Sequence, residues 1–166
     1  MNKKTEQKWV FFYDTDHILQ EVENITATLA SRPIGKEGQS RPYLILNEDA
    51  SDLFLRLIKD ALSDIRLSVY KYLEPEHPAD DMRRVDRIHI HANLTLGDSE
   101  DVPSAVRVLD DKIREYLIYR VIFGWLLLKA PEEAQYYQEH TAQVLDDIKH
   151  VFNKSGGSTR RKYHLF

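Results

Sequence analysis

The sequence predicts a mainly α fold, a four-helix antiparallel bundle with a small β element of one or two short strands. The first observation is the stretch Ser104–Leu128, which has no interior proline and repeats apolar residues every three or four positions, as one face of a helix requires. The second is that three further segments show the same spacing. The third is residues 88–96, where apolar and polar residues alternate as in a half-buried strand.

The central helix has two unlike halves. Up to Arg120 the face opposite the apolar stripe carries charged residues, whereas Val121–Leu128 is apolar at every position except its glycine. A helix that is apolar all round has to be covered all round. We therefore expect Leu117, Val121 and Trp125 at the centre of the core, with cover supplied by the chain's own segments or by neighbouring copies.

The first helix follows the aromatic run Trp9–Tyr13, which is either a short strand or an apolar arm. Residues Asp14–Asp16 offer N-cap oxygens and negative charge to the first helical turn. The helix is expected to end before Pro33. Residues 33–42 contain two glycines and two prolines and are expected to form a flexible connector.

A second helix is predicted from an N-cap at Asn47 to about Leu73, where two prolines turn the chain. A strand then covers residues 85–96. A single strand needs a partner. The candidates are the run Trp9–Tyr13, the segment Tyr43–Leu46, or an edge of another subunit.

The fourth helix begins at Pro131, with Glu132 and Glu133 placed favourably for the helix dipole. Because the connection to the central helix is short, the two helices form either a tight antiparallel hairpin or one long helix kinked at Pro131. We expect a single helical domain over residues 1–153, followed by a C-terminal tail over residues 154–166.

The tail differs from the body in charge. Residues 154–166 contain four Lys or Arg and no acid, which leaves 19 basic and 27 acidic residues, a net charge of −8, in residues 1–153. An acidic body repels phosphate backbones, whereas opposite charges on body and tail suit contact between copies. The expected partner-binding residues are the basic cluster and the apolar aromatic end of the tail: Arg160, Arg161, Lys162, Tyr163, Leu165 and Phe166.

Cysteine is absent, which excludes disulfides, thiol catalysis and thiolate metal sites. No apolar run approaches the ~20 residues needed to cross a bilayer, and the first residues lack a signal-peptide pattern. We therefore expect a cytoplasmic protein without membrane contact.

Two short motifs raise the question of chemistry. The segment Val10–Asp16 resembles the strand and Asp-x-Asp that open haloacid-dehalogenase-type phosphatases, but the helices that follow lack the alternation with strands that such enzymes need. We therefore interpret its acids as helix caps. His89 and His91 point to one face of a strand, a spacing that metal sites use. A solvent-facing pair is the favoured interpretation, and we expect no catalytic site, no metal and no cofactor.

Three features occur together in residues 104–166: a helix reading REYLIYRVIFGWLLL, a Pro-Glu-Glu start to another amphipathic helix, and a basic tail with an aromatic end. In this pattern the chain resembles small structural proteins of tailed phages and prophages, of the head–tail connector or neck-ring adaptor type. The resemblance implies a closed ring of copies that links portal to tail, contacts with portal, tail or neck proteins, and location in the virion after assembly in the host cytoplasm. Nucleic acid would at most pass through the ring lumen.

Two other classes of function stay open. A cytosolic helical adaptor or regulator would share the amphipathic helices and would bind a partner protein as a monomer or dimer. A small enzyme or metal protein would use His89 and His91, with Asp86, His77 or Glu76 as a third ligand.

Overall fold

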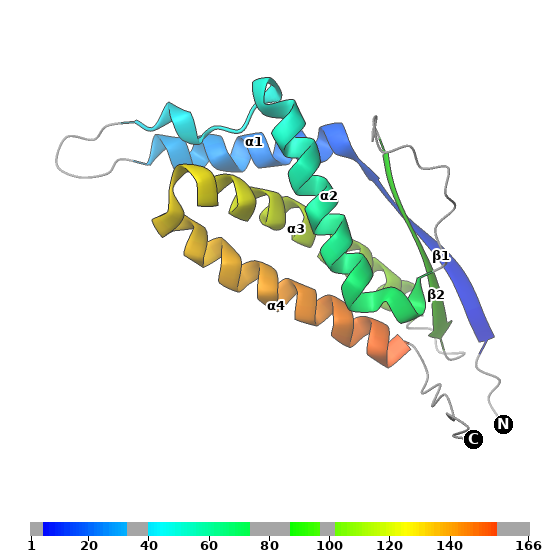
Figure 1. Ribbon diagram of the computed structural model, residues 1–166. Coiled ribbons are helices and arrows are strands. Elements are labelled where there is room, and N and C mark those ends of the chain that lie inside the picture. Colours follow the sequence, from blue (N-terminus) through cyan, green and yellow to red (C-terminus); the bar gives the residue numbers. More distant parts are fainter. Residues whose placement is uncertain (1–4, 33–39, 74–86, 97–101, 156–166) are drawn as a thin grey trace, which may run out of the picture.

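The computed structural model describes residues 5–32, 40–73, 87–96 and 102–155, and it confirms the mainly α fold with four helices and a small sheet (Figure 1). The helices are α1 (Thr15–Ser31), α2 (Ser51–Val69), α3 (Val102–Lys129) and α4 (Pro131–Ser155). The strands are β1 (Thr5–Asp14) and β2 (Arg87–Leu96). Short 3-10 turns cover Pro42–Leu44, Glu48–Ala50 and Tyr70–Tyr72.

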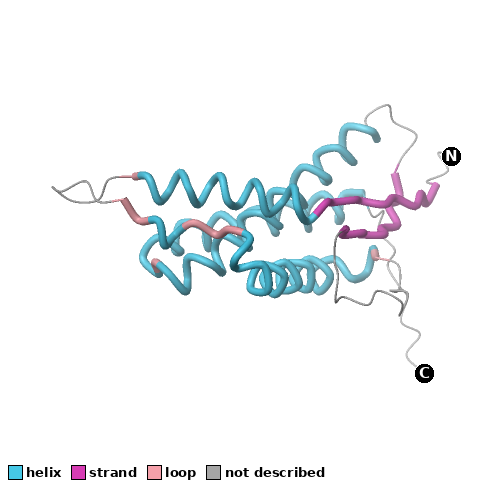
Figure 2. The backbone as a smooth tube through the Cα atoms, turned by 90° about the horizontal axis from the view of Figure 1, so that it is seen from above, coloured by secondary structure: helices cyan, strands magenta, loops and turns pink. Residues whose placement is uncertain are grey.

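Helices α3 and α4 form an antiparallel hairpin, which decides between the two arrangements left open for the break at Pro131. Helix α1 lies along α3, and α2 crosses the hairpin at a steep angle (Figure 1). Seen from above, the two strands gather at one end of an elongated helical body (Figure 2). The turn between α3 and α4 lies at the other end.

The sheet consists of β1 paired antiparallel with β2, in a register that sets Phe11 opposite Ile90 and Phe12 opposite His89. The run Trp9–Tyr13 is therefore the strand partner. The other candidate within the chain, Tyr43–Leu46, is not a strand, because Pro42 starts a 3-10 turn there. Alternation along both strands buries one face of the sheet against the helices; the buried side chains are Phe11, Tyr13, Ile88, Ile90, Ala92 and Leu94.

The core is one apolar cluster that joins the inner face of the sheet to all four helices, with α3 at its centre. Leu117 and Val121 are completely buried and Trp125 is 6% exposed, as predicted. Helix α2 crosses α3 closely at Gly124, where an added Cβ would lie 2.4 Å from a methyl carbon of Leu57. A glycine at this position lets the two helices approach.

Buried and half-buried hydrogen bonds hold the helices in register around α3. The Asp64 carboxylate on α2 accepts from the Tyr116 hydroxyl at 3.1 Å and from Arg120 Nε at 2.9 Å. The Tyr13 hydroxyl on β1 donates to Asp110 Oδ1 on α3 at 2.8 Å. These bonds tie both α2 and the sheet to the same helix.

The predicted start of α1 is confirmed and that of α2 is wrong in detail. The Asp14 carboxylate accepts hydrogen bonds from the backbone N–H groups of Asp16 and His17, so the last residue of β1 caps α1. Asn47 makes no capping bond, because a 3-10 turn separates it from α2 and its amide donates to Asp49 instead. Helix α2 begins at Ser51.

Asp14→Ala is expected to lower the free energy of unfolding by about 1 kcal/mol, because two N–H groups of the first turn lose their acceptor. Asn24→Ala on the exposed side of α1 is the matched control, with an expected change within about 0.5 kcal/mol. Urea unfolding followed by circular dichroism measures both. Equal effects in the two variants would contradict the capping role.

Some expectations lie outside the described residues. These are most of the flexible connector, namely residues 33–39, and the tail from residue 156 onward. The part of the connector that is described is anchored to α1, because the Arg41 N–H donates to the Ala30 carbonyl at 2.9 Å. Helix α4 extends through Lys154 and Ser155, the first two residues assigned to the tail.

Candidate interaction surface

The apolar end of α3 is only partly covered by the rest of the chain. Ile122 and Leu126 are completely buried, whereas Leu127 and Leu128 are 53% and 63% exposed. Helices α1, α2 and α4 pack on the other sides of α3. The described segments of the chain therefore leave this end of α3 partly exposed to solvent. A neighbouring copy is the other source from which the sequence led us to expect burial of these side chains.

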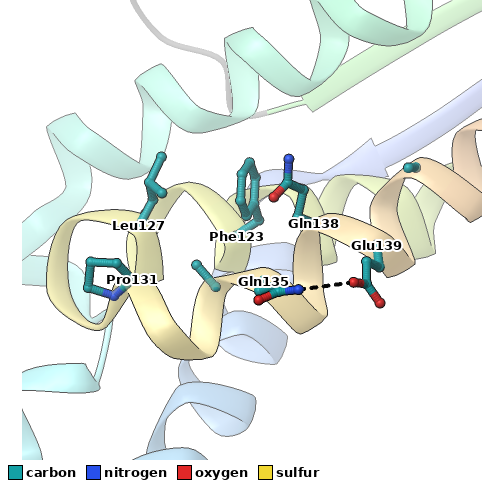
Figure 3. A pocket seen from close by; sticks show the side chains of 8 residues that line it. Phe123, Leu127, Pro131, Gln135, Gln138 and Glu139 are labelled. Carbon is teal, nitrogen blue, oxygen red and sulfur yellow. Dashed lines mark hydrogen bonds between the residues drawn. The ribbon is translucent and has the colours of Figure 1, made fainter.

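A groove of about 510 Å³ lies between the last turns of α3 and the first turns of α4 (Figure 3). Its apolar lining consists of Phe123, Leu127, Pro131, Ala134 and Ala142. Its polar lining consists of Gln135, Gln138 and Glu139. The α4 residues recur at spacings of three and four, so they share one face of that helix.

The end of the hairpin that carries the groove is held in place by three features. Pro131 lacks an N–H and so begins α4 without losing a helical hydrogen bond. The Trp125 indole N–H on α3 donates to the Leu44 carbonyl at 2.7 Å inside the core. An ion pair between Arg41 and Glu133 ties the first turn of α4 to the segment that follows α1. The groove is therefore a preformed surface.

One carboxylate, that of Glu139, lines the groove. Figure 3 shows Gln135 and Glu139 on α4, where Gln135 Nε2 donates to Glu139 Oε1 at 3.3 Å. Glu132 is not part of the groove lining but lies two turns before Glu139 on α4; both are exposed, and among the described residues neither forms a salt bridge. Glu133, in contrast, is paired with Arg41. An apolar floor beside two carboxylates without a cation partner suits a segment that carries large apolar side chains next to basic ones.

The α3 wall of the groove continues toward the sheet as a polar and aromatic cluster. The Tyr119 ring lies 4.4 Å from the His140 ring, and His140 Nε2 lies 3.0 Å from Glu115 Oε1. Lys112 also bonds Glu115, and this hydrogen bond raises the pKa of the Lys112 ammonium. This cluster was not predicted from the sequence. The signal that was present is the spacing of four residues along α3, which places four side chains on one face: Glu115, Tyr119, Phe123 and Leu127.

The outer face of the sheet carries a second exposed apolar group. Val10 and Phe12 on β1 are 55% and 50% exposed. The His89 ring meets the Phe12 ring edge-on at 5.1 Å, and the Arg87 guanidinium lies 5.6 Å from the Phe12 ring centre. The inner face of the same strands belongs to the core, so this surface is a consequence of alternation along β1.

His89 and His91 are both exposed on the outer face of β2, with ring centres 6.3 Å apart. The residues weighed as a third ligand, Asp86, His77 and Glu76, lie outside the described residues. Within the described ranges, no group of three His, Asp or Glu side chains is arranged to hold a metal ion. The contacts observed on this face are therefore the ring contact between Phe12 and His89 and the cation–π contact of Arg87 with Phe12.

The expected partner-binding residues of the tail, Arg160, Arg161, Lys162, Tyr163, Leu165 and Phe166, lie outside the described residues. Of the helices in the described ranges, none is long and apolar enough to span a membrane. No family model matches the chain, and no curated protein or solved structure matches it either. The groove between α3 and α4 is therefore the candidate surface considered for function.

Proposed function

We propose that this protein is a structural assembly subunit, which forms a ring with copies of itself and acts as a head–tail connector between the portal and the tail of a tailed phage. The phage context rests on the resemblance of residues 104–166. The observation that carries the assembly role is the exposed apolar surface at the end of the α3–α4 hairpin, around Leu127 and Leu128. Exposed large apolar side chains beside a groove suit a contact with another molecule.

Two complementary features on one chain favour a head-to-tail assembly, of which a ring is the closed form. The body carries a groove lined by apolar side chains and by Glu139, and the tail carries basic and aromatic residues. When different surfaces of identical subunits bind each other, the contact is head-to-tail. Such contacts close into rings if the rotation between subunits allows it, and otherwise they grow into filaments.

The assembly role predicts that the purified full chain is a large oligomer. Native mass spectrometry and analytical ultracentrifugation measure its mass. A monomer or dimer would instead favour the adaptor or regulator class, because such a protein uses the same amphipathic helices on a partner protein. A filament would keep the head-to-tail contact but contradict the closed ring.

Leu127→Lys is expected to weaken self-association about tenfold or more, because an ammonium group in an apolar contact is buried without a partner. Since Leu127 is 53% exposed in the single chain, the melting temperature should stay within a few degrees of the original value. Leu67→Lys is the control: Leu67 is 76% exposed in the last turn of α2 and does not line the groove. Equal loss of assembly in both variants would contradict the role of the hairpin end.

A further inference from the structure

We infer that residues 160–166 of one copy dock in the α3–α4 groove of a neighbouring copy. This inference rests on the proposed self-assembly, and it specifies the contact through which neighbouring copies associate. The groove is the receptor, and the tail supplies apolar side chains that fit its lining and basic side chains that complement its carboxylate. Apolar, electrostatic and geometric observations support the match.

The apolar part of the match concerns the floor of the groove. Ala134 and Ala142 on α4 are small, while Phe123 and Leu127 rise from α3, so the floor leaves room for large side chains between two helices. The tail provides them as Tyr163, Leu165 and Phe166. Aromatic and aliphatic anchors that fill a preformed pocket contribute most of the binding energy in such contacts.

The electrostatic part concerns Glu139, which lines the groove, and Glu132, which lies nearby on the same helix; among the described residues neither forms a salt bridge. They are separated by two turns of α4, or about 10 Å along the helix. Arg160, Arg161 and Lys162 directly precede the apolar end of the tail. Their long side chains reach both carboxylates from one docked segment, and these ion pairs set its direction and register.

The geometric part decides which copy supplies the tail. The tail leaves α4 at Ser155, at the sheet end of the hairpin, whereas the groove lies at the opposite end (Figure 1). From Ser155 back to Gln138 the helix covers about 26 Å. The chain from Ser155 to Tyr163 spans at most about 28 Å when fully extended. A tail docked on its own body would therefore have no slack, while a neighbouring copy imposes no such limit.

Charge also selects the occupant. The body has a net charge of −8 and the Glu139 carboxylate lines the groove, so acidic segments of other proteins are repelled. The tail is a basic segment present in every copy, at the same concentration as the groove. A second copy of this chain is thus the occupant that the observations favour.

The absence of cysteine allows a direct test by disulfide cross-linking between full-length chains. One copy carries Gln138→Cys in the groove, and the other carries Tyr163→Cys in the tail. After mixing and mild oxidation, we expect a cross-linked pair that forms at least tenfold faster than the pair of Tyr163→Cys with Gln20→Cys, an exposed position on α1. Intact-mass and peptide mass spectrometry identify the linked residues.

The outcomes separate this inference from the proposed function. Equal cross-linking to both positions in an assembled ring would overturn the docking site and leave the assembly role standing. Rapid cross-linking within a single chain that carries both Gln138→Cys and Tyr163→Cys, unaffected by dilution, would place the tail on its own body and overturn the exchange between copies.

A second measurement keeps the inference testable if the chain is monomeric. A fluorescent peptide of residues 154–166 is titrated onto the full chain and followed by anisotropy. We expect saturable, salt-sensitive binding that Glu139→Lys weakens at least fivefold, while Glu23→Lys on α1 has little effect. Binding that is insensitive to Glu139→Lys, or no binding in either case, would overturn the docking site.

Discussion

Leu117→Ala is expected to lower the free energy of unfolding by about 2 to 5 kcal/mol, the largest effect of a single side-chain truncation that we predict. Leu117 is completely buried near the middle of α3, the helix that contacts α1, α2 and α4. Truncation removes apolar contacts and leaves a cavity. Helices that pack on three sides of α3 and are tied to it by hydrogen bonds cannot collapse freely into that cavity.

Guanidinium or urea unfolding of the full chain measures this loss. Leu67→Ala is the matched control, because the same side chain is 76% exposed on α2 and its removal should change the free energy by less than about 0.5 kcal/mol. A loss below about half a kilocalorie for Leu117→Ala would show that the centre of the core lies elsewhere.

The sequence predicted the helices well because their apolar stripes are long and their ends carry clear signals. Asp14 caps α1 and Pro131 opens α4 as expected. The predicted start of α2 rested on a single polar residue and was wrong, because Asn47 precedes a 3-10 turn and the helix starts several residues later. A side chain that is able to cap does not by itself fix the backbone that follows.

The strand pairing and the arrangement of α3 and α4 could not be predicted from the sequence. Periodicity identified residues 88–96 as a strand but could not choose its partner, because strand pairing joins segments that are far apart in sequence. The pairing of Phe11 with Ile90 follows from burying two apolar faces together. Likewise the break at Pro131 allowed a kink or a hairpin, and packing of α4 on α3 decides for the hairpin.

The candidate surface was only half predictable. The basic and aromatic composition of residues 160–166 singled out the tail. The groove could not be recognised, since Ala134 is nearly fully buried and Gln138 is exposed, yet both line it. Such a site arises from the angle between two helices, which side-chain spacing along either helix does not determine.

The stability of the protein is expected to fall steeply as the pH rises above about 10. Tyr13, Tyr116 and Tyr137 are all buried. Burial raises the pKa of each, and in Tyr13 and Tyr116 the nearby Asp110 and Asp64 carboxylates raise the pKa further. An unfolded tyrosine loses its proton near pH 10, while these folded ones keep theirs. The folded state therefore binds more protons above pH 10, and its stability decreases as the pH increases.

Each tyrosine that keeps its proton in the folded state lowers the free energy of unfolding by up to about 1.4 kcal/mol per pH unit, so Tyr13 and Tyr116, whose pKa values are raised most, together reach roughly 3 kcal/mol per pH unit. Denaturant unfolding at a series of pH values from 9 to 12 measures the slope, and tyrosinate absorbance reports when the rings ionise. Tyr13→Phe removes one titrating group and should reduce the slope by up to about 1.4 kcal/mol per pH unit. Tyr43→Phe, at a ring that is 54% exposed, should leave it unchanged. If Tyr13→Phe leaves the slope as unchanged as Tyr43→Phe does, the buried Tyr13 hydroxyl that donates to Asp110 does not determine the loss of stability at high pH.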